Sequence, residues 1–361
     1  MLEFKISEWK DDDDDSNKQE NITKDNGRLI ILIGTLICEY NGDNWTYFPL
    51  VDQDKISDQI ISLRCPALLE IPHKTDDVVN TLLLSGGFDS TKNQTSKQCF
   101  TINKYQSKKD EQYYSLNFGY SDMIIPRFLH KTLNIDNKYF LTIGGKNDNS
   151  WLDDCEVFNF ESRKWINFEK MNSKRSNFDA IYINKKVFVF GGFESFEKFS
   201  SNSIEMCDFN LNDISVIKWK VINIKFPLLS SCKVTKANFD NQLMIIGGCD
   251  ENSIKNHIYL FDVDKYDFKI LSNLTVSRAN FHYFKDDDSF ICIGGSFIKL
   301  YGIENKVSNF IEKTNLSTMK SELINFDQID FLNKIGYFIE ENYFQIIKIE
   351  NGLPYSSSIQ I

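Results

Sequence analysis

Five apolar, strand-like segments of this chain each end in a pair of glycines. The second glycines of these pairs are 47 to 58 residues apart, so the chain repeats a supersecondary unit of about 50 residues. This recurrence constrains the fold more than any other feature, because a unit of this length must bury its faces against its neighbours. The pairs are Gly86-Gly87, Gly144-Gly145, Gly191-Gly192, Gly247-Gly248 and Gly294-Gly295.

The residues around each pair predict four short strands per unit. In four units an Asn- or Asp-containing turn lies six to eight residues before the first glycine, which indicates a tight hairpin. An alternating strand follows the glycines, and a third strand carries Trp165 or Trp219 in two units. A fourth strand is introduced by an arginine, at Arg127, Arg175 and Arg278. Because no helical period separates these strands, each unit is predicted to form one antiparallel sheet.

The unit resembles the kelch repeat. In the best unit, Glu156-Val157-Phe158, Trp165 and Met171 precede Arg175, and a strand over 178–183 then leads to the diglycine at Gly192. The resemblance extends over about residues 28–350, with good motifs in five units and degraded ones in two. It implies an all-β fold, a single β-propeller of four-stranded antiparallel blades around a central channel.

Seven candidate second strands predict seven blades, and six blades is the alternative. These strands lie near residues 30, 83, 141, 188, 244, 291 and 337. The first unit lacks an obvious inner strand and the last an obvious outer one, so residues 2–9 or 356–361 are candidates to close the ring by joining both termini in one sheet. We expect an acidic segment over residues 1–27, with or without a closing strand, followed by the propeller over 28–361.

Composition and charge exclude several classes of partner. The chain has 361 residues, of which 42% are apolar and 14% aromatic, enough for a large core. Residues 1–27 hold nine acids and four bases and so carry half of the net charge of −10. The remainder is near balance, which argues against nucleic acid as a partner. The run Asp11–Asp15 lacks the glycine and glutamate of a calcium loop. We interpret it as a solvated loop, with a basic partner or a divalent cation as alternatives.

The location expected from the sequence is cytoplasmic. The N-terminus lacks the apolar stretch of a secretory signal, and no apolar run reaches 18 residues, so no membrane span is expected. The eight cysteines include no C-x-x-C pair, which favours reduced thiols in the core of an intracellular protein.

Candidate catalytic residues are few. The four histidines lie in different repeats without metal-ligand spacing, and the diglycines end strands without a following helix, unlike phosphate-binding loops. We therefore expect no catalysis, no metal and no cofactor. The alternative is an enzyme or a carbohydrate-binding propeller with a site in the channel, which requires His130, His282 and a carboxylate to converge there.

The long, polar loops after the diglycines favour a protein-interaction module. They leave the blades on the same face as the connections between blades, and rigid scaffolds carry binding residues on such loops. We expect a scaffold or adaptor, for example a substrate-recruiting or cytoskeletal one, that binds another protein, with an acidic peptide segment as one candidate. For the arginines, the alternative is a structural role, tied to carbonyls and acids of the blades. The candidate partner-binding residues are Arg127, Arg175, Arg278, Trp151, Phe193, Phe196, Glu194 and Asp250, and the structural motif comprises the ten glycines with Trp165 and Trp219.

Overall fold

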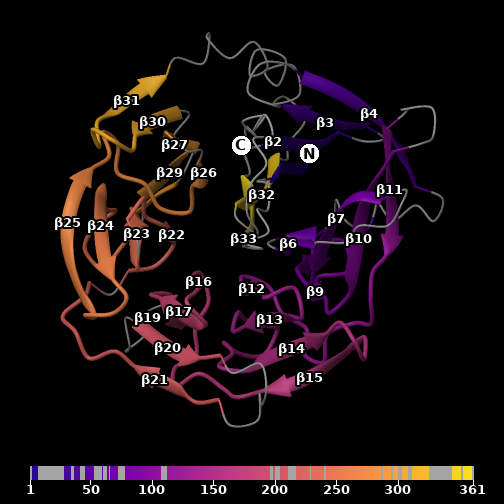
Figure 1. Cartoon of the computed structure of the whole chain (residues 1–361), viewed down its shortest axis with the longest axis horizontal. Helices are drawn as coiled ribbons and strands as arrows, with labels where there is room; N and C mark the ends of the chain where they lie inside the picture. The colour runs from indigo at the N-terminus through magenta and orange to yellow at the C-terminus, as the bar shows by residue number, and fades with distance from the viewer. Residues whose placement is uncertain are drawn as a thin grey trace, which may run out of the picture.

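The fold is seen in a computed structural model of the whole chain, in which the strands form sheets arranged as a ring (Figure 1). The structure describes residues 2–6, 28–33, 36–40, 45–52, 59, 63–64, 66–71, 78–106, 112–195, 198–199, 204–209, 217–227, 229–239, 241–285, 288–293, 296–299, 303–307, 311–324, 344–350 and 353–359. It is an all-β propeller with antiparallel blades, as the sequence predicts. Within the described ranges, no helix has the length and hydropathy needed to cross a membrane.

Five blades lie in the described part of the chain: four are separate four-stranded antiparallel sheets, and the first is the antiparallel end, β6-β7-β10-β11, of a 10-stranded sheet. The first has β6 (Ala67–Ile71), β7 (Val78–Ser85), β10 (Cys99–Gln106) and β11 (Gln112–Phe118), and the second has β12 (Lys131–Ile135), β13 (Tyr139–Ile143), β14 (Cys155–Asn159) and β15 (Lys164–Phe168). The third has β16 (Asp179–Ile183), β17 (Lys186–Phe190), β20 (Ile204–Asp208) and β21 (Trp219–Val221). The fourth has β22 (Lys233–Lys236), β23 (Gln242–Ile246), β24 (His257–Asp262) and β25 (Asp267–Asn273), and the fifth has β26 (His282–Lys285), β27 (Ser289–Ile293), β30 (Ile311–Asn315) and β31 (Ser321–Ile324).

The other six strands of the 10-stranded sheet, which we call the closing sheet, come from both ends of the chain. Its order is β33-β32-β1-β2-β3-β4, and β1 pairs in parallel with β32. On its outer side β4 pairs in parallel with β11 of the first blade, and β33 lies against β6 and β12 (Figure 1). Its strands are β1 (Leu2–Ile6), β2 (Arg28–Ile33), β3 (Leu36–Tyr40), β4 (Trp45–Val51), β32 (Phe344–Glu350) and β33 (Leu353–Ile359).

The predicted count of seven blades is not confirmed. Five of the seven candidate second strands are β7, β13, β17, β23 and β27, each second in a four-stranded blade. The candidate near residue 30 is β2, which lies in the closing sheet, and the one near 337 lies outside the described residues. The difference between seven predicted blades and five blades in the described residues therefore comes from the two units with degraded motifs.

The core is divided into layers between successive blades. One apolar cluster joins the second and third blades, with Leu133 and Ile143 packed against Val187 and Val189. Similar clusters join the first to the second blade, the third to the fourth and the fourth to the fifth. The second, third and fourth blades thus bury both faces, which explains the nearly continuous apolar strands before the glycines.

The diglycines hold successive blades together. The second glycine of each described pair donates its N–H to the residue that leads into the next blade: Gly87 to the Arg127 carbonyl (2.9 Å), Gly145 to Arg175 (2.9 Å), Gly192 to Leu229 (2.8 Å) and Gly248 to Arg278 (2.7 Å). We call these four acceptors the lead residues. A Cβ on Gly191 would lie 1.8 Å from the Leu229 carbonyl oxygen, so this close approach requires glycine. The fifth pair, Gly294-Gly295, lies outside the described residues.

A second set of backbone bonds runs around the ring. The residue two positions after each lead residue has a left-handed backbone, with φ between 52° and 55°. Asn177 donates to Leu129 (3.4 Å), Ser231 to Asn177 (2.8 Å) and Asn280 to Ser231 (3.1 Å). The inner strands of four successive blades are therefore linked by consecutive hydrogen bonds.

Three two- or three-stranded ladders lie beyond the blades, on the loops. They are formed by β5 (Leu63–Arg64) with β8 (Phe88–Asp89) and β9 (Gln94–Thr95), by β18 (Phe193–Ser195) with β19 (Lys198–Phe199), and by β28 (Ser296–Lys299) with β29 (Ile303–Val307).

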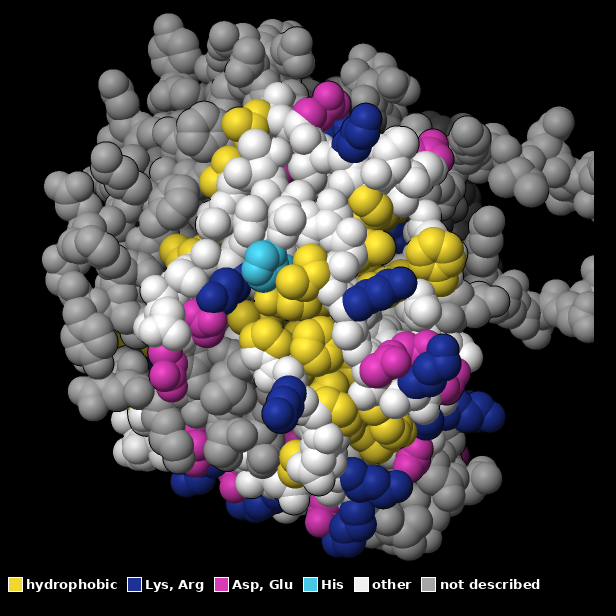
Figure 2. Space-filling view, turned by 90° about the vertical axis from the view of Figure 1, so that its left-hand side faces the viewer, with side chains coloured by type: hydrophobic (Ala, Val, Ile, Leu, Met, Phe, Trp, Pro, Cys, Tyr) yellow, Lys and Arg dark blue, Asp and Glu magenta, His cyan; other side chains and the backbone are white. Residues whose placement is uncertain are grey.

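The outer rim carries apolar side chains on the β25 side of the ring, where Figure 2 shows hydrophobic side chains gathered in one area. On β25 itself Ile270 is 54% exposed, and the half-buried ring of Phe268 lies 4.8 Å from that of Phe226.

Candidate functional site

The loops after the diglycines are held by short ladders on one face of the ring. In the second blade, Phe128, which follows the lead residue, pairs with Lys146, which follows the diglycine, and Lys146 in turn pairs with Trp151. The third and fourth blades repeat the first of these pairs, as Ser176 with Phe193 and Ser230 with Cys249. Backbone pairing therefore fixes the positions of residues that the sequence places in loops.

Four residues of the first two blades form an aromatic patch on this face. The ring centroids of Phe88 and Phe128 are 5.5 Å apart, although the two residues belong to different blades. The Lys146 ammonium lies 5.1 Å from the centroid of the Phe128 ring and 4.8 Å from that of Trp151. All four side chains are half-buried. The aromatic patch, defined as Phe88, Phe128, Lys146 and Trp151, is thus a set of partly exposed rings, two of which lie beside one cation.

Burial and a neighbouring acid act in opposite directions on this cation. Burial lowers the pKa of Lys146, and the nearby Asp148 carboxylate partly offsets that effect. Asp148 also accepts hydrogen bonds from the Thr95 N–H (3.0 Å) and hydroxyl (2.5 Å) in the first blade. The two loops under the patch are therefore tied together across the blade boundary.

The fourth blade has a different surface at the same positions. Ser230, Cys249 and Ile254 occupy the places of Phe128, Lys146 and Trp151 in the ladder. Ser230 and Cys249 are buried, and only Ile254 is half-buried. The fourth blade therefore lacks the exposed aromatic and cationic side chains that the second blade contributes to the patch.

The three predicted arginines do not belong to the exposed surface. Arg127, Arg175 and Arg278 are fully buried, each in an ion pair with a glutamate of the third strand of its own blade. The pairs are Arg127 with Glu156 (2.6 Å), Arg175 with Glu205 (2.5 Å) and Arg278 with Glu312 (3.2 Å). Since no guanidinium of this set faces solvent, the predicted partner-binding role of the three arginines is corrected to the structural alternative, three internal ion pairs.

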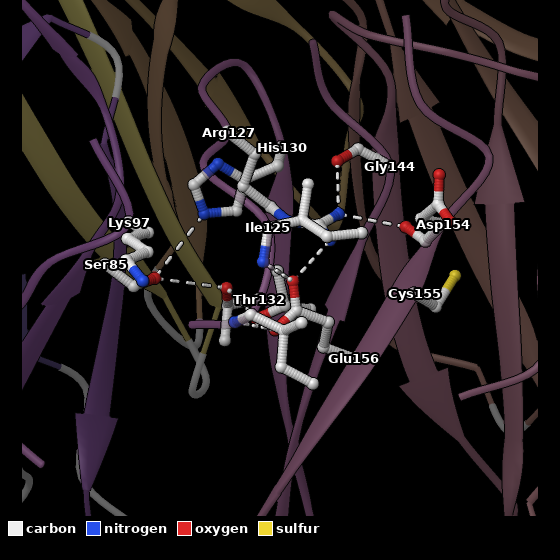
Figure 3. A network of polar contacts seen from close by, with 12 residues as sticks. Ser85, Lys97, Ile125, Arg127, His130, Thr132, Gly144, Asp154, Cys155 and Glu156 are labelled. Carbon is white, nitrogen blue, oxygen red and sulfur yellow. Dashed lines mark hydrogen bonds and ion pairs between the residues drawn. The ribbon is translucent and has the colours of Figure 1, made fainter. Parts of the chain in front are cut away.

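Figure 3 shows the arrangement around Arg127. Its guanidinium donates to the carbonyls of Gly144 (2.7 Å) and Asp154 (2.9 Å) as well as to Glu156. The other Glu156 oxygen accepts the N–H of Ile124 (2.6 Å), in the connection between the first and second blades. Each ion pair therefore fixes the start of an inner strand.

The other predicted binding residues are spread over three blades. Trp151 lies in the aromatic patch, half-buried Phe193 and Glu194 lie in the third blade, and Phe196 lies outside the described residues. Asp250 in the fourth blade forms an ion pair with Lys255 (2.5 Å). Burial acts to raise the pKa of Asp250, but hydrogen bonds from Lys255 and from two backbone N–H groups of its own loop hold that pKa below its usual value.

Three residues of the patch, Phe88, Phe128 and Lys146, are absent from the predicted set of binding residues. Phe88 directly follows Gly87, as Phe193 follows Gly192, and Phe128 directly follows Arg127. The position after the diglycine is therefore a signal that identifies Phe88. The contact between the two rings depends on the packing of adjacent blades.

The histidines do not form a catalytic cluster in the part of the chain that the structure describes. Buried His130 has its Nε2 3.5 Å from the Ser85 hydroxyl, and burial, reinforced by the Arg127 charge, lowers the pKa of its imidazole well below the usual value. His257 contacts Asn273 near the surface (2.6 Å), and neither His73 nor the side chain of His282 is described. No carboxylate is among the hydrogen-bond partners of His130 in these residues.

Thiols and metal-binding clusters give no further candidate within the described ranges. Six cysteines there are free and buried, and burial raises the pKa of Cys155 and Cys232 to about 12. No group of three or more His, Cys, Asp or Glu side chains in this part of the chain has the arrangement of a metal site.

Comparison with known proteins agrees with the repeats and the ring. The family model of the KLHDC2/KLHL20/DRC7 Kelch-repeats domain matches residues 72–295. The chain is 26% identical over 106 residues to Spermatocyte protein spe-26 of Caenorhabditis elegans, a match that covers 29% of this chain and 17% of that protein. It is 31% identical over 71 residues to Dynein alpha chain, flagellar outer arm, of Chlamydomonas reinhardtii, covering 19% of this chain and 2% of that protein. These matches span a small part of both relatives. From its diglycine repeats, its ring of antiparallel blades and the family match over more than half its length, the chain belongs to the kelch-repeat family.

Proposed function

We propose that this propeller is a non-catalytic protein-interaction module, a scaffold or adaptor, whose partner protein binds the face that carries the aromatic patch. Kelch propellers commonly have this role, and the aromatic patch is the observation that carries the proposal here. The rings of Phe88, Phe128 and Trp151 are partly exposed and come from two blades, so a partner on this face contacts both.

Physical chemistry supports such a patch as a binding centre. Large, rigid aromatic side chains contribute much contact area at a low cost in conformational entropy, and they dominate the energetics of many interfaces. The ladder pairing of Phe128, Lys146 and Trp151 reduces that cost further, because their backbone is already ordered. Lys146 supplies positive charge, which suits a partner segment with an acidic residue beside an apolar one.

Three further features belong to the same proposal. The closing sheet takes the remaining sector of the ring as a sixth blade, in which strand β1 of the acidic segment 1–27 completes the propeller unit of residues 28–361. The partner is neither nucleic acid nor membrane. The match to a flagellar outer-arm dynein chain supports a cytoskeletal, cytoplasmic setting.

The test is capture of partners by the tagged chain from lysate of its native cell, quantified by mass spectrometry. We expect a double variant, Phe128→Ala with Trp151→Ala, to lose its specific partners by at least about tenfold, the effect of removing an interface hot spot. The matched control is Ile254→Ala, which truncates the position equivalent to Trp151 in the fourth blade and should retain them. Equal capture by both variants, with thermal unfolding like that of the unmodified chain, would overturn the proposal.

A further inference from the structure

The boundary between the first and second blades differs in its core from the three that follow. At the boundary between the second and third blades, four equivalent positions are apolar and lie in one cluster, as Ile143, Phe178, Ala180 and Val189. The third-to-fourth boundary has Phe190, Cys232, Val234 and Ile245 there, and the fourth-to-fifth has Ile246, Phe281, Tyr283 and Cys292. At the first-to-second boundary, the same positions are Ser85, His130, Thr132 and Thr142.

These four polar side chains form a buried chain of contacts, of which Figure 3 shows those of Ser85 with His130 and Thr132. The Ser85 hydroxyl lies 3.5 Å from both His130 Nε2 and the Thr132 hydroxyl, and Thr132 lies 2.9 Å from Thr142. His130 Nδ1 is buried without a hydrogen-bond partner among the described residues. A Cβ on Gly86 would lie 2.9 Å from Cε1 of the ring, so the imidazole is tightly enclosed.

The charged groups around this imidazole do not favour its protonated form. The lead residue Arg127 is the charge that acts on it, and this guanidinium is bound to Glu156. Lys131, next in the chain, forms an ion pair with Asp179 of the third blade. On β6, Ala67 pairs with Ser85, whereas Glu70 pairs with Leu82. Strand β33, which packs on β12, has no acid, lysine, arginine or histidine.

An enclosed imidazole without a carboxylate takes up a proton only after the surrounding structure opens. The folded-state pKa of His130 is depressed by burial, whereas an opened state restores the usual value near 6.5. The closed state therefore keeps its full stability above about pH 6.5 and loses it as the pH falls, with the open fraction rising by about tenfold per pH unit.

We propose that the boundary between the first and second blades is the acid-sensitive joint of this propeller, which opens when His130 is protonated and separates Phe88 from Phe128 in the aromatic patch. The effect on the patch rests on the proposed function, whereas the opening itself does not. The same boundary carries the 5.5 Å contact between these two rings, so opening removes the ordered arrangement that a partner would meet.

Hydrogen exchange at about pH 7 and about pH 5, corrected for the intrinsic pH dependence of amide exchange, tests the joint. We expect peptides over 81–100 and 127–145 to show about thirtyfold more opening at the lower pH, and peptides over 178–192 to show little change. His130→Phe places in this slot the residue that Phe178 and Phe281 supply at other boundaries, and it should abolish the increase. An increase that persists in this variant, or that is equal at every boundary, would overturn the proposal.

A reciprocal variant covers the case in which His130→Phe fails to fold. Phe178→His introduces an enclosed imidazole at the second-to-third boundary, so peptides over 178–192 should become acid-sensitive. Exchange there that stays independent of pH contradicts the proposal.

Partner capture at the two pH values separates this inference from the proposed function. The unmodified chain should lose its partners at about pH 5, and His130→Phe should keep them. If Phe128→Ala with Trp151→Ala leaves capture unchanged while the exchange result holds, the proposed binding face fails and the acid-sensitive joint stands.

Discussion

The third and fourth blades share one backbone design but hold the start of their inner strands by opposite chemistry. In the third blade, the buried Arg175 guanidinium donates to the Gly191 carbonyl (2.8 Å) and to Glu205 (2.5 Å). Glu205 also accepts the backbone N–H groups of Asn172 (2.7 Å) and Ser173 (3.0 Å). One ion pair therefore provides hydrogen-bond partners for two backbone N–H groups in the connection between two blades and for one carbonyl.

We call the arginine, the glutamate and the two residues whose N–H groups bind the glutamate the polar cage. In the fourth blade, all four of these positions hold other residues. Leu229 is the lead residue, and Tyr259 occupies the strand position of Glu205. Phe226 and Pro227 replace the two residues whose N–H groups bind the glutamate, and proline has no N–H to donate. The rings of Phe226 and Tyr259 pack edge to face with centroids 5.3 Å apart.

This difference shows that the four residues of the polar cage are exchanged together for an apolar set. A buried arginine needs its glutamate, and the glutamate needs donors, because a buried charge without partners costs several kcal/mol. The apolar version carries neither charge, and one of its two backbone donors is removed as well. The second and fifth blades follow the third, with Arg127–Glu156 and Arg278–Glu312.

The largest expected effect comes from breaking the polar cage by one substitution. Arg175→Leu leaves the Glu205 carboxylate buried without its cation, and we expect the free energy of unfolding to fall by about 3–5 kcal/mol, measured by chemical denaturation. The control is Leu229→Met, which conserves volume at the equivalent apolar position and should cost less than about 1.5 kcal/mol. A loss below about 1 kcal/mol for Arg175→Leu would mean that the ion pair is dispensable in the third blade.

An intermediate effect is expected when the whole cage is exchanged. The variant Asn172→Phe, Ser173→Pro, Arg175→Leu and Glu205→Tyr copies the fourth-blade set into the third blade. Replacement of a buried ion pair by packed apolar groups is often neutral for stability. We therefore expect the free energy of unfolding of this variant, measured by chemical denaturation, to lie within about 2 kcal/mol of that of the unmodified chain. If it is less stable than Arg175→Leu alone, the apolar set depends on surroundings that the third blade lacks.

The sequence predicts local features of this molecule well and contacts between repeats poorly. The diglycines and their flanking strands predict the blades because each unit carries its own hairpin and strand pattern. The glutamate partner of Arg175 lies 30 positions further along the chain at Glu205, where nothing marks it as buried. The contact between Phe88 and Phe128, and the polar boundary at His130, likewise depend on which faces of two blades meet.

The degraded first and last units show a second limit. Counting strands gives each such unit a blade of its own, whereas β1, β2 and β32 lie in one sheet. Which strands share a sheet at the closure of a ring depends on pairing between the two ends of the chain. A motif count does not contain that information, and the strands missing from these units predict only that residues 2–9 or 356–361 are candidates to join both termini in one sheet.

The smallest expected effect tests whether an ion pair between or within blades contributes to stability because it is buried, rather than because it is charged. Lys218 and Glu169 form an ion pair (2.8 Å) between the third and second blades, with side chains 67% and 38% exposed. Because water and salt screen such a pair, Lys218→Ala should change the free energy of unfolding by less than about 0.5 kcal/mol, measured by chemical denaturation at low and high salt. Arg175→Leu, by contrast, removes a cation that water does not reach. A loss above about 1 kcal/mol for Lys218→Ala, diminished by salt, would indicate that surface charges between blades hold the ring together as well.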